Sequence, residues 1–163
     1  MQSWAKEMVV YQIWPRSFKD SNGDGIGDIN GVISKLDYLQ DLGINCIWFS
    51  PLYKSPQKDY GYDISDYYSI APEYGTMDDF KKLIAECKKR NIRIIMDLVI
   101  NHTSDQHEWF LKSLGGNKKY HDYYFWRKGK GKRPPNNWMS SFPGDAWKYR
   151  KETGEYYLHL FAV

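Results

Sequence analysis

One carboxylate, that of Asp97, interrupts an apolar stretch, and the imidazole of His102 follows the end of the same stretch. The run 92–100 around Asp97 is otherwise almost entirely apolar and rich in β-branched residues, which is typical of a strand buried on both faces of a parallel sheet. An ionised Asp there costs free energy unless it is hydrogen-bonded, paired or open to a polar cavity. Ligands bind at the carboxyl ends of such strands, which makes both residues candidate binding groups. A structural Asp beside a loop His of no functional consequence explains the same pattern, and both interpretations remain open.

An oxygen-rich loop between a predicted strand and a predicted helix has the spacing of a calcium-binding loop, with Gly25 where such loops turn sharply. Its candidate ligands are four side chains and one backbone carbonyl: Asp20, Asn22, Asp24, Ile26 (carbonyl) and Asp28. Gly31 stands where an EF-hand has its bidentate Glu, so water must complete the shell. We therefore expect a structural Ca²⁺ ion, with a turn of solvated carboxylates as the alternative.

A third polar cluster combines carboxylates and phenols around a glycine, in the order Asp59, Tyr60, Gly61, Tyr62 and Asp63. A carboxylate can accept hydrogen bonds from two adjacent sugar hydroxyls, and a Tyr ring can stack on a pyranose face. A surface loop with a tyrosine-bearing turn is the competing interpretation.

Composition predicts a globular protein with an unusual aromatic content. Hydrophobic residues make up 42%, charged residues 26% and aromatic residues 17% of the chain. The net charge of +3 does not indicate a polyanionic partner, and the basic run Lys128–Arg133 has no accompanying nucleic-acid-binding motif, so we interpret it as a solvated loop. His102 and His107 lack the setting of a zinc site. We expect no nucleic acid or membrane partner, and the sequence leaves the oligomeric state open.

The start of the chain lacks the apolar core of a signal peptide, and no apolar run is long enough to span a bilayer. Cys46 and Cys87 are then most simply buried thiols in a reducing compartment. These features predict a cytoplasmic protein.

The elements that position these groups alternate between strands and helices. Strands are expected at Val9–Trp14, at Ile44–Phe49 and from Ile92 onward, with a helix over Gly31–Leu42 and another capped by Thr76. The core face of the second helix is expected at offsets of 0, 3, 4 and 7: Phe80, Leu83, Ile84 and Cys87. Repeated strand–loop–helix units predict right-handed crossovers and a parallel sheet, hence an α/β fold.

The pattern changes after His102. A short helix is expected at Glu108–Leu114, an irregular aromatic and basic stretch over 117–146, and a hairpin whose arms are Trp147–Arg150 and Glu155–Phe161. We therefore expect two domains: 1–102, built from βα units, and 103–163, a small β-containing domain inserted after the third strand.

Several motifs together resemble one enzyme family over essentially the whole chain. They are VVYQIWPRSF, DSNGDGIGDINGV, LDYLQDLGINCIWFSPLYKSP, DYGYDISDY, DLVINHTSDQHEWF, NNWMSSFPGDAW and YYLHLF. They are similar to the N-terminal part of the oligo-1,6-glucosidases and related α-glucosidases of glycoside hydrolase family 13, the α-amylase superfamily. The resemblance implies the first three βα units of a (β/α)8 TIM barrel, an incomplete barrel, with a small domain inserted after strand three.

The resemblance also implies roles for individual residues. Asp97 matches an Asp that orders the active site, and His102 matches a His that binds glucose hydroxyls. Asp59 and Tyr62 match the pair that holds the non-reducing glucose. The aromatic walls of that pocket are matched by Phe142 and Phe161, and the loop at 20–28 matches the family's metal loop.

Family members cleave with retention, using a nucleophile and an acid/base carboxylate from strands four and five. The resemblance places both beyond Val163, so we expect the 163-residue chain alone to be inactive although it carries substrate-binding residues. The first hypothesis is therefore a glycosidase of carbohydrate metabolism acting on small α-1,6- or α-1,4-linked gluco-oligosaccharides. The alternative is a non-catalytic relative that serves as a binding or interaction module. The set of matched glucose-binding residues argues against it.

Overall fold

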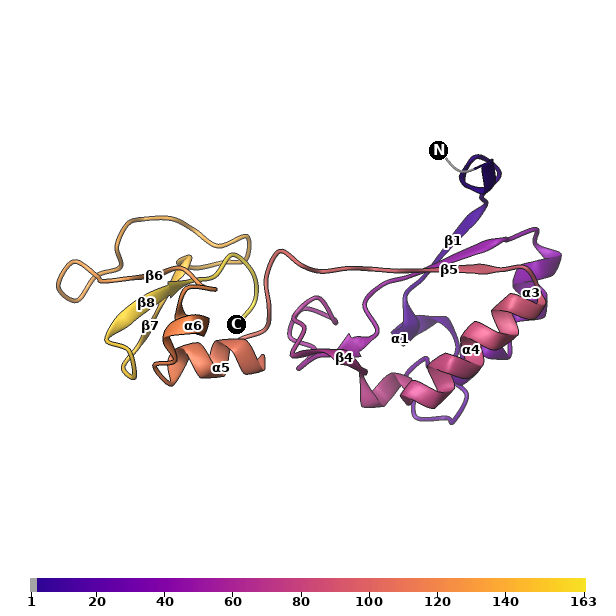
Figure 1. The fold of residues 1–163 in the computed structure, drawn as a ribbon, viewed down its shortest axis with the longest axis horizontal. Coiled ribbons are helices and arrows are strands. Elements are labelled where there is room, and N and C mark those ends of the chain that lie inside the picture. The colour runs from indigo at the N-terminus through magenta and orange to yellow at the C-terminus, as the bar shows by residue number, and fades with distance from the viewer. Residues whose placement is uncertain (1–2) are drawn as a thin grey trace. The chain divides into compact units, whose positions relative to one another are not determined.

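A parallel three-stranded sheet forms the centre of the first part of the chain, in a computed structural model that describes residues 3–163 (Figure 1). Its strands are β1 (Val10–Ile13), β2 (Cys46–Phe49) and β5 (Arg93–Met96), in the order β1-β2-β5. Both pairings are parallel, with Ile47 of β2 opposite Tyr11 on one side and Ile94 on the other. The parallel sheet expected from the strand–loop–helix pattern is confirmed.

Strand β5 is less buried than its apolar sequence predicts. Its side chains alternate between exposed and half-buried, and Ile95 is 36% exposed. The reason is that β5 is an edge strand of the described sheet, and helices α3 and α4 lie on one side of that sheet (Figure 1). The prediction of a strand buried on both faces is therefore wrong for the described residues.

Helix α4 (Met77–Lys89) begins at the expected cap. Thr76 Oγ1 accepts the backbone N–H of Asp79 at 3.1 Å, and the Asp79 carboxylate accepts the Thr76 N–H at 2.8 Å. This reciprocal capping box satisfies two donors at the start of the helix. Leu83 and Cys87 are buried as expected, whereas Ile84 is 46% exposed, so the apolar face is narrower than its spacing indicates.

The single helix expected over residues 31–42 is two short helices, α2 (Ile29–Ile33) and α3 (Leu36–Asp41). Between them, the Ser34 hydroxyl donates to the Gly31 carbonyl at 2.6 Å. Serine competes for backbone acceptors in this way, which explains the interruption. The apolar residues of both helices still face the same core.

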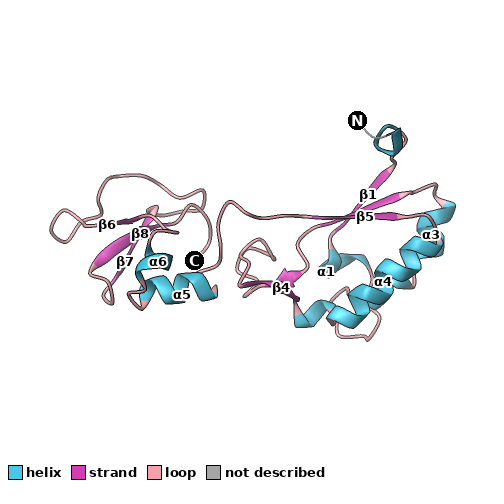
Figure 2. Ribbon diagram, viewed as in Figure 1, coloured by secondary structure: helices cyan, strands magenta, loops and turns pink. Residues whose placement is uncertain are grey.

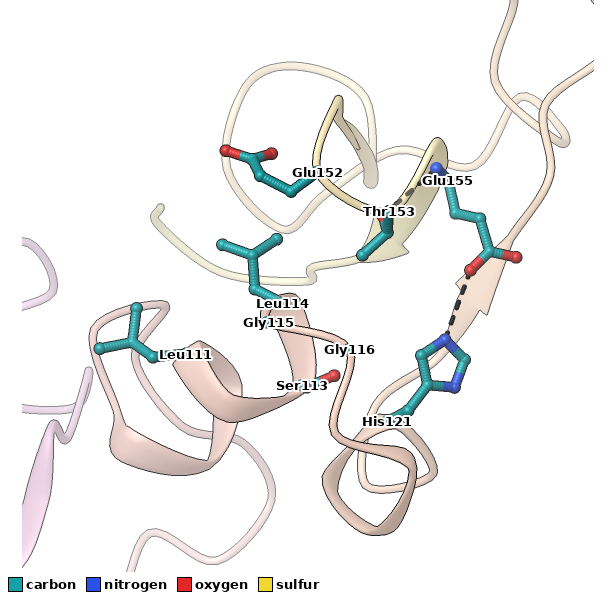
Figure 3. Close-up of a pocket in the computed structure, with 9 residues that line it drawn as sticks. All are labelled: Leu111, Ser113, Leu114, Gly115, Gly116, His121, Glu152, Thr153 and Glu155. Carbon is teal, nitrogen blue, oxygen red and sulfur yellow. Dashed lines mark hydrogen bonds and ion pairs between the residues drawn. The ribbon is translucent and has the colours of Figure 1, made fainter.

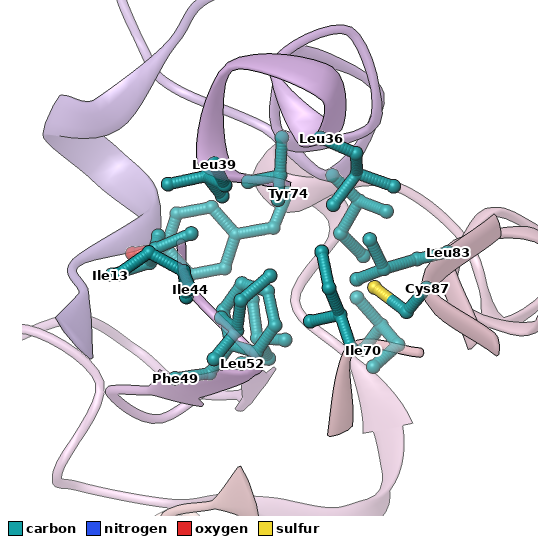
Figure 4. Close-up of a cluster of buried hydrophobic side chains, with 14 of the residues drawn as sticks. Ile13, Leu36, Leu39, Ile44, Phe49, Leu52, Ile70, Tyr74, Leu83 and Cys87 are labelled. Atoms are coloured by element: carbon teal, nitrogen blue, oxygen red, sulfur yellow. The ribbon is translucent and has the colours of Figure 1, made fainter. Parts of the chain in front are cut away.

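That core lies between the sheet and the helices (Figure 4). Ile13 and Phe49 come from the sheet, Leu36 and Leu39 from α3, and Leu83 from α4, and each is fully buried. Helix α4 therefore packs its apolar side against residues that are far away in the sequence.

The connection between β2 and α4 contains further regular elements. These are β3 (Tyr53–Lys54), β4 (Asp66–Ile70) and the 3-10 helix η2 (Pro72–Tyr74), with β3 and β4 forming a two-stranded sheet. The remaining short elements near the N-terminus are η1 (Ser3–Lys6) and α1 (Pro15–Phe18). Pro15 therefore starts a helix after the first strand, where its fixed φ is favourable.

The second part of the chain is built on a three-stranded antiparallel sheet (Figure 2). Its strands are β6 (Trp126–Arg127), β7 (Trp147–Arg150) and β8 (Glu155–Leu158), in the order β6-β8-β7. The β7–β8 hairpin confirms the predicted one, although β8 ends earlier than expected. Two helices accompany the sheet, α5 (Glu108–Leu114), as predicted, and α6 (Lys118–His121), which the sequence analysis missed.

Contacts divide the chain into two compact units. The first comprises the described residues up to Lys54 together with Tyr67–Val99, and the second comprises Ser55–Asp66 together with Ile100–Val163. The loop Ser55–Asp66 thus packs with residues that follow it by more than thirty positions. No helix among residues 3–163 is both long enough and apolar enough to cross a bilayer.

Candidate functional site

The loop Ser55–Asp66 of the second unit is organised around one buried carboxylate, that of Asp63. It accepts hydrogen bonds from the Ser55 hydroxyl at 2.7 Å, from the Lys58 N–H at 2.9 Å and from the Asp59 N–H at 3.1 Å. Asp63 is only 4% exposed, so these donors compensate for the burial of its charge. Asp63 is therefore the residue that shapes the loop.

The loop backbone turns sharply on both sides of Asp59. Gln57 and Tyr60 have φ values of 60° and 50°, and Gly61 has a φ of 100°. Left-handed conformations are costly for residues with a Cβ and persist where the surrounding structure imposes them. The Tyr62 N–H then donates to the Asp59 carbonyl at 3.0 Å, which closes a tight turn between the two candidate sugar-binding residues.

The Asp59 carboxylate is in the opposite situation to Asp63. No hydrogen bond or ion pair links its oxygens to any other group among residues 3–163. Burial, and then the negative charge of Asp63, raise the pKa of Asp59, and His102 acts against them. A half-buried carboxylate with unused acceptor oxygens can accept hydroxyl donors from a ligand.

The His102 ring is held between two groups of the same unit. Its Nε2 lies 3.1 Å from the Tyr62 carbonyl oxygen, and its Nδ1 lies 3.1 Å from the Asn101 amide nitrogen. Nε2 must donate to a carbonyl and Nδ1 must accept from an amide N–H, which assigns the neutral Nε2–H tautomer. The ring also stacks on Phe161 with centroids 4.4 Å apart.

The two residues predicted to form aromatic walls, Phe142 and Phe161, lie on two segments of the second unit that are hydrogen-bonded to each other. The Ser141 N–H donates to the Leu160 carbonyl at 2.8 Å, and the Ser140 hydroxyl donates to the same oxygen at 3.0 Å. Phe142, which is 41% exposed, and Phe161 directly follow these paired residues. The second unit therefore brings together Asp59, Tyr62, His102 and Phe161 through direct contacts, with Phe142 on the adjoining segment.

Asp97 belongs to the first unit and lies directly after β5. It is half-buried, and its N–H donates to the Phe49 carbonyl at 3.1 Å, which continues the strand pairing for one residue. Burial, and then the charge of Asp97, raise the pKa of Tyr53. Asp97 is thus a half-buried carboxylate at a strand end, near enough to Tyr53 for its charge to raise the pKa of that phenol, and not an acid sealed in an apolar core.

The oxygen-rich loop Asp20–Asp28 of the first unit is ordered by its own backbone. The Asp20 carboxylate accepts the N–H groups of Asn22, Gly23 and Gly25 at 2.9, 2.7 and 2.8 Å. The hydrogen bond from Gly23 is the largest of the effects that lower the pKa of Asp20. Asp24 likewise accepts the Ile26 N–H at 2.8 Å. This network curls the oxygen-bearing residues into one compact turn.

Asp28, the last candidate ligand, is a helix cap in this structure. Its carboxylate accepts the N–H and hydroxyl of Ser21, both at 2.9 Å, and the N–H of Gly31 at 2.7 Å. Burial raises the pKa of Asp28, and the hydrogen bonds from Ser21 and Gly31 outweigh it, so the net direction is downward. In the part of the chain that the structure describes, no three His, Cys, Asp or Glu side chains are gathered at metal-binding distance. The donor set is nevertheless hard oxygen, the chemistry that Ca²⁺ prefers.

Gly31, where an EF-hand has its last ligand, is required by packing. A Cβ on Gly31 would lie 1.9 Å from the Lys19 carbonyl oxygen. No side chain fits at that position, and α2 can therefore approach the start of the loop closely.

A recess of about 650 Å³ lies elsewhere in the second unit, between α5 and the β7–β8 turn (Figure 3). Its titratable lining includes His121 and Glu155, whose Nε2 and carboxylate oxygen are 3.3 Å apart, and Glu152. None of the predicted substrate-binding residues lines it.

Sequence reasoning missed several residues that support the site. Ser55 and Asn101 are polar residues that lie close in the sequence to the predicted site residues Asp59 and His102, and this proximity is the signal that could have identified them. The backbone carbonyl of Tyr62, by contrast, gives no sequence signal for its contact with His102. His107 caps α5, with its Nδ1 accepting the Trp109 N–H at 3.1 Å, and burial lowers its pKa.

Residues 12–163 match the family model described as "Alpha amylase, catalytic domain". The oligo-1,6-glucosidase of Parageobacillus thermoglucosidasius is 61% identical over 160 residues, which is 98% of this chain and 28% of that protein. The oligo-1,6-glucosidase of Bacillus cereus is 59% identical over 162 residues, 99% of this chain and 29% of that protein.

Among solved structures, a mutant isomaltulose synthase from Erwinia rhapontici NX5 in complex with sucrose superposes with a TM-score of 0.96 and 58% identity. The match covers 99% of this chain and 29% of that one. This chain therefore spans less than a third of the length of the relatives that it matches.

Proposed function

Because this chain belongs to the α-amylase family, we propose that it supplies part of the glucose-binding pocket of a retaining α-glucosidase. The whole protein would hydrolyse small α-1,6- or α-1,4-linked gluco-oligosaccharides. The observation that carries this proposal is the assembly of Asp59, Tyr62, His102 and Phe161 within one unit, because it combines an unused carboxylate with stacked rings. Carboxylate–hydroxyl hydrogen bonds and ring stacking are what a pyranose requires.

In this proposal each residue has a separate task. Asp59 accepts hydrogen bonds from glucose hydroxyls, and the Tyr62 ring packs against the sugar face. His102, held in its Nε2–H tautomer, orients the Tyr62 turn and lies beside the Phe161 wall. Phe142 covers a further side, and Asp97 keeps the ordering role that the family resemblance implies for it.

We assign no nucleophile or acid/base to residues 1–163. Retaining glycosidases require two carboxyl groups about 5–5.5 Å apart on opposite sides of the scissile bond. The resemblance assigns Asp59, Asp63 and Asp97 to binding and ordering positions. We also propose that the pocket is completed by a (β/α)8 barrel.

The test is to compare binding with turnover. The 163-residue chain is expected to bind methyl α-glucoside, with chemical-shift changes at Tyr62 and His102, and to release no nitrophenol from p-nitrophenyl α-glucoside. Enzyme-dependent turnover by the chain alone would show that we have assigned the catalytic groups to the wrong segments.

The names of the relatives given above, oligo-1,6-glucosidase and isomaltulose synthase, indicate different products from the glucosyl group. Water as acceptor gives hydrolysis, whereas the isomaltulose synthase is named for a different product and has sucrose as its natural substrate. We propose hydrolysis because the two curated relatives described above, which are 61% and 59% identical to this chain, are oligo-1,6-glucosidases. Product analysis of the whole protein with isomaltose and with sucrose decides: glucose from isomaltose supports hydrolysis, and isomaltulose from sucrose contradicts it.

We also propose that the loop Asp20–Asp28 binds a structural Ca²⁺ ion through the side chains of Asp20, Asn22, Asp24 and Asp28 and the carbonyl of Ile26. The ion would stabilise the loop electrostatically, and it takes no part in the chemistry that we propose.

A further inference from the structure

An ordered group of five cations lies on one edge of the antiparallel sheet of the second unit. We call it the cationic edge; it consists of Arg127, Lys128, Lys130, Lys132 and Arg133. All five side chains are exposed. The next acidic residue along the chain is Asp145, so the stretch contains no counter-charge of its own.

None of these five side chains forms an ion pair with a carboxylate among residues 3–163. Some other cations of the chain do form ion pairs, such as Lys81 with Asp78 and Lys112 with Glu108. Unpaired like charges at close spacing repel one another, which makes an anionic ligand favourable there.

The cationic edge is a formed hairpin and not an irregular loop. The Lys130 N–H donates to the Arg133 carbonyl at 2.9 Å, and the Arg133 N–H donates back at 3.2 Å. Gly131 takes the left-handed φ of 62° at the turn. The run is therefore a solvated loop, as the sequence predicts, and its tip is a tight turn closed by an isolated β-bridge.

Tyr156 anchors this hairpin to the sheet. Its hydroxyl donates to the Lys132 carbonyl at 3.4 Å, and a Cβ on Gly129 would lie 2.6 Å from its ring. Glycine at position 129 therefore allows the basic hairpin to lie against an aromatic ring.

Strand register places aromatic and basic groups on the same face. Arg127 of β6 is opposite Tyr156 of β8, and Tyr156 is opposite Tyr149 of β7, so all three side chains point to one side. Tyr149 is 53% exposed, and its ring centroid is 5.2 Å from that of Tyr156. An exposed ring on the same face as a cation can bind a molecule that has both a flat apolar face and anionic groups.

We propose that this face binds a phosphate-bearing gluco-oligosaccharide, with its phosphates on the cationic edge and a pyranose ring on Tyr149. The saccharide part rests on the proposed function, whereas the preference for phosphate rests on the unpaired cations. The recess between α5 and the β7–β8 turn is lined by other residues, so the proposed ligand lies on the exposed face of the sheet.

Titration calorimetry with the 163-residue chain tests this proposal, with phosphorylated maltodextrin and unphosphorylated maltodextrin as probes. At roughly 50 mM KCl the phosphorylated probe is expected to bind at least about tenfold more tightly, and raising the salt to roughly 300 mM should remove most of this preference. Equal affinity for both probes would overturn the proposal.

The variant Lys128→Ala/Lys130→Ala/Lys132→Ala should lose the preference for phosphate. A matched control, Lys82→Ala/Lys88→Ala/Lys118→Ala, removes the same charge from exposed helical positions and should retain it. Loss of the preference in both variants would mean that only net charge matters, and the site would be refuted. Far-UV circular dichroism checks that each variant folds, and Lys128→Gln/Lys130→Gln/Lys132→Gln replaces the alanine variant if it does not.

Two further measurements separate the ligand classes. Tyr149→Ala should weaken binding of phosphorylated maltodextrin and leave binding of inorganic tripolyphosphate unchanged. An oligothymidylate that binds as tightly as phosphorylated maltodextrin would overturn the saccharide assignment. Asp59→Ala should abolish binding of methyl α-glucoside and retain the preference for phosphate, so that failure of the proposed function can be distinguished from failure of this site.

Discussion

Two polar loops of this chain use an Asp carboxylate to collect N–H groups, and they differ in what is left for a ligand. In the loop Asp20–Asp28 the carboxylates of Asp20 and Asp28 accept donors from the loop itself, and the pKa of each is lowered. In the loop Ser55–Asp66 one residue, Asp63, takes the donors, and its neighbour Asp59 is left half-buried with a raised pKa.

The difference separates two uses of the same residue type. A carboxylate surrounded by N–H groups is stabilised as the anion, and it makes a good cap or a good partner for a cation. A half-buried carboxylate with few donors is destabilised as the anion, and a ligand that brings hydroxyl donors relieves that cost. The first loop therefore keeps its carboxylates ionised, and the second loop leaves one carboxylate with unused acceptor oxygens; the proposed calcium and sugar sites depend on these two properties.

We expect the largest effect from Gly31→Ala, which should disrupt the structure of the loop Asp20–Asp28. The new Cβ would lie 1.9 Å from the Lys19 carbonyl oxygen, so the loop or α2 must move, and we expect a cost of about 4 kcal/mol. Urea denaturation measures it. Gly23→Ala is the matched control, because a Cβ there meets nothing within 4 Å and only the φ of 85° opposes it. Equal destabilisation by both changes would contradict the close approach.

The second loop should collapse on replacement of Asp63. Asp63→Ala leaves two backbone N–H groups and the Ser55 hydroxyl without their acceptor, at an expected cost of about 3 kcal/mol, and methyl α-glucoside binding should be lost. Asp59→Ala is the control for the comparison, since it should abolish binding with little change in the urea midpoint. If both variants unfold at the same midpoint as the unaltered chain, Asp63 does not shape the loop.

Calcium should act on the first loop alone. Millimolar Ca²⁺ is expected to raise the melting temperature by a few degrees and EDTA to reverse the shift, because an ion that binds only the folded state stabilises it. Asp24→Asn should reduce the shift, whereas Asp59→Asn should leave it intact. A melting temperature that is indifferent to both additions would leave the loop as an ordinary turn.

The smallest effect is the opposite pH dependence of the two loops. The folded pKa of Asp59 is raised, so the folded state binds more protons than the unfolded state just above pH 3.8, and stability falls as pH rises through that window. Asp59→Asn should therefore gain stability relative to the unaltered chain between acidic and neutral pH. The folded pKa of Asp20 is lowered, so its contribution is present at neutral pH and is lost as pH falls below 3.8, and Asp20→Asn should show the opposite trend. Trends of the same sign in urea titrations at several pH values would refute the contrast.

Features that depend on neighbours in the sequence were predictable. The capping box of Thr76 and Asp79, the β7–β8 hairpin and α5 all form from contacts within a few residues, and their patterns predicted them. The elements β3, β4 and α6 are short, and their sequences differ too little from loop sequences to be recognised.

The local sequence determined that β1, β2 and β5 are strands and that α4 begins at Thr76. It also determined that oxygen-bearing side chains follow one another from Asp20 to Asp28. The reason is that helix caps, turns and the alternation of polar and apolar side chains depend on residues that are adjacent in the sequence. Only the tertiary structure decided that Ser55–Asp66 packs with the second unit, that Asp59 rather than Asp63 keeps its acceptors, and that His102 meets Tyr62 and Phe161. Burial and donor supply at these residues come from segments distant along the chain, and no local pattern records them.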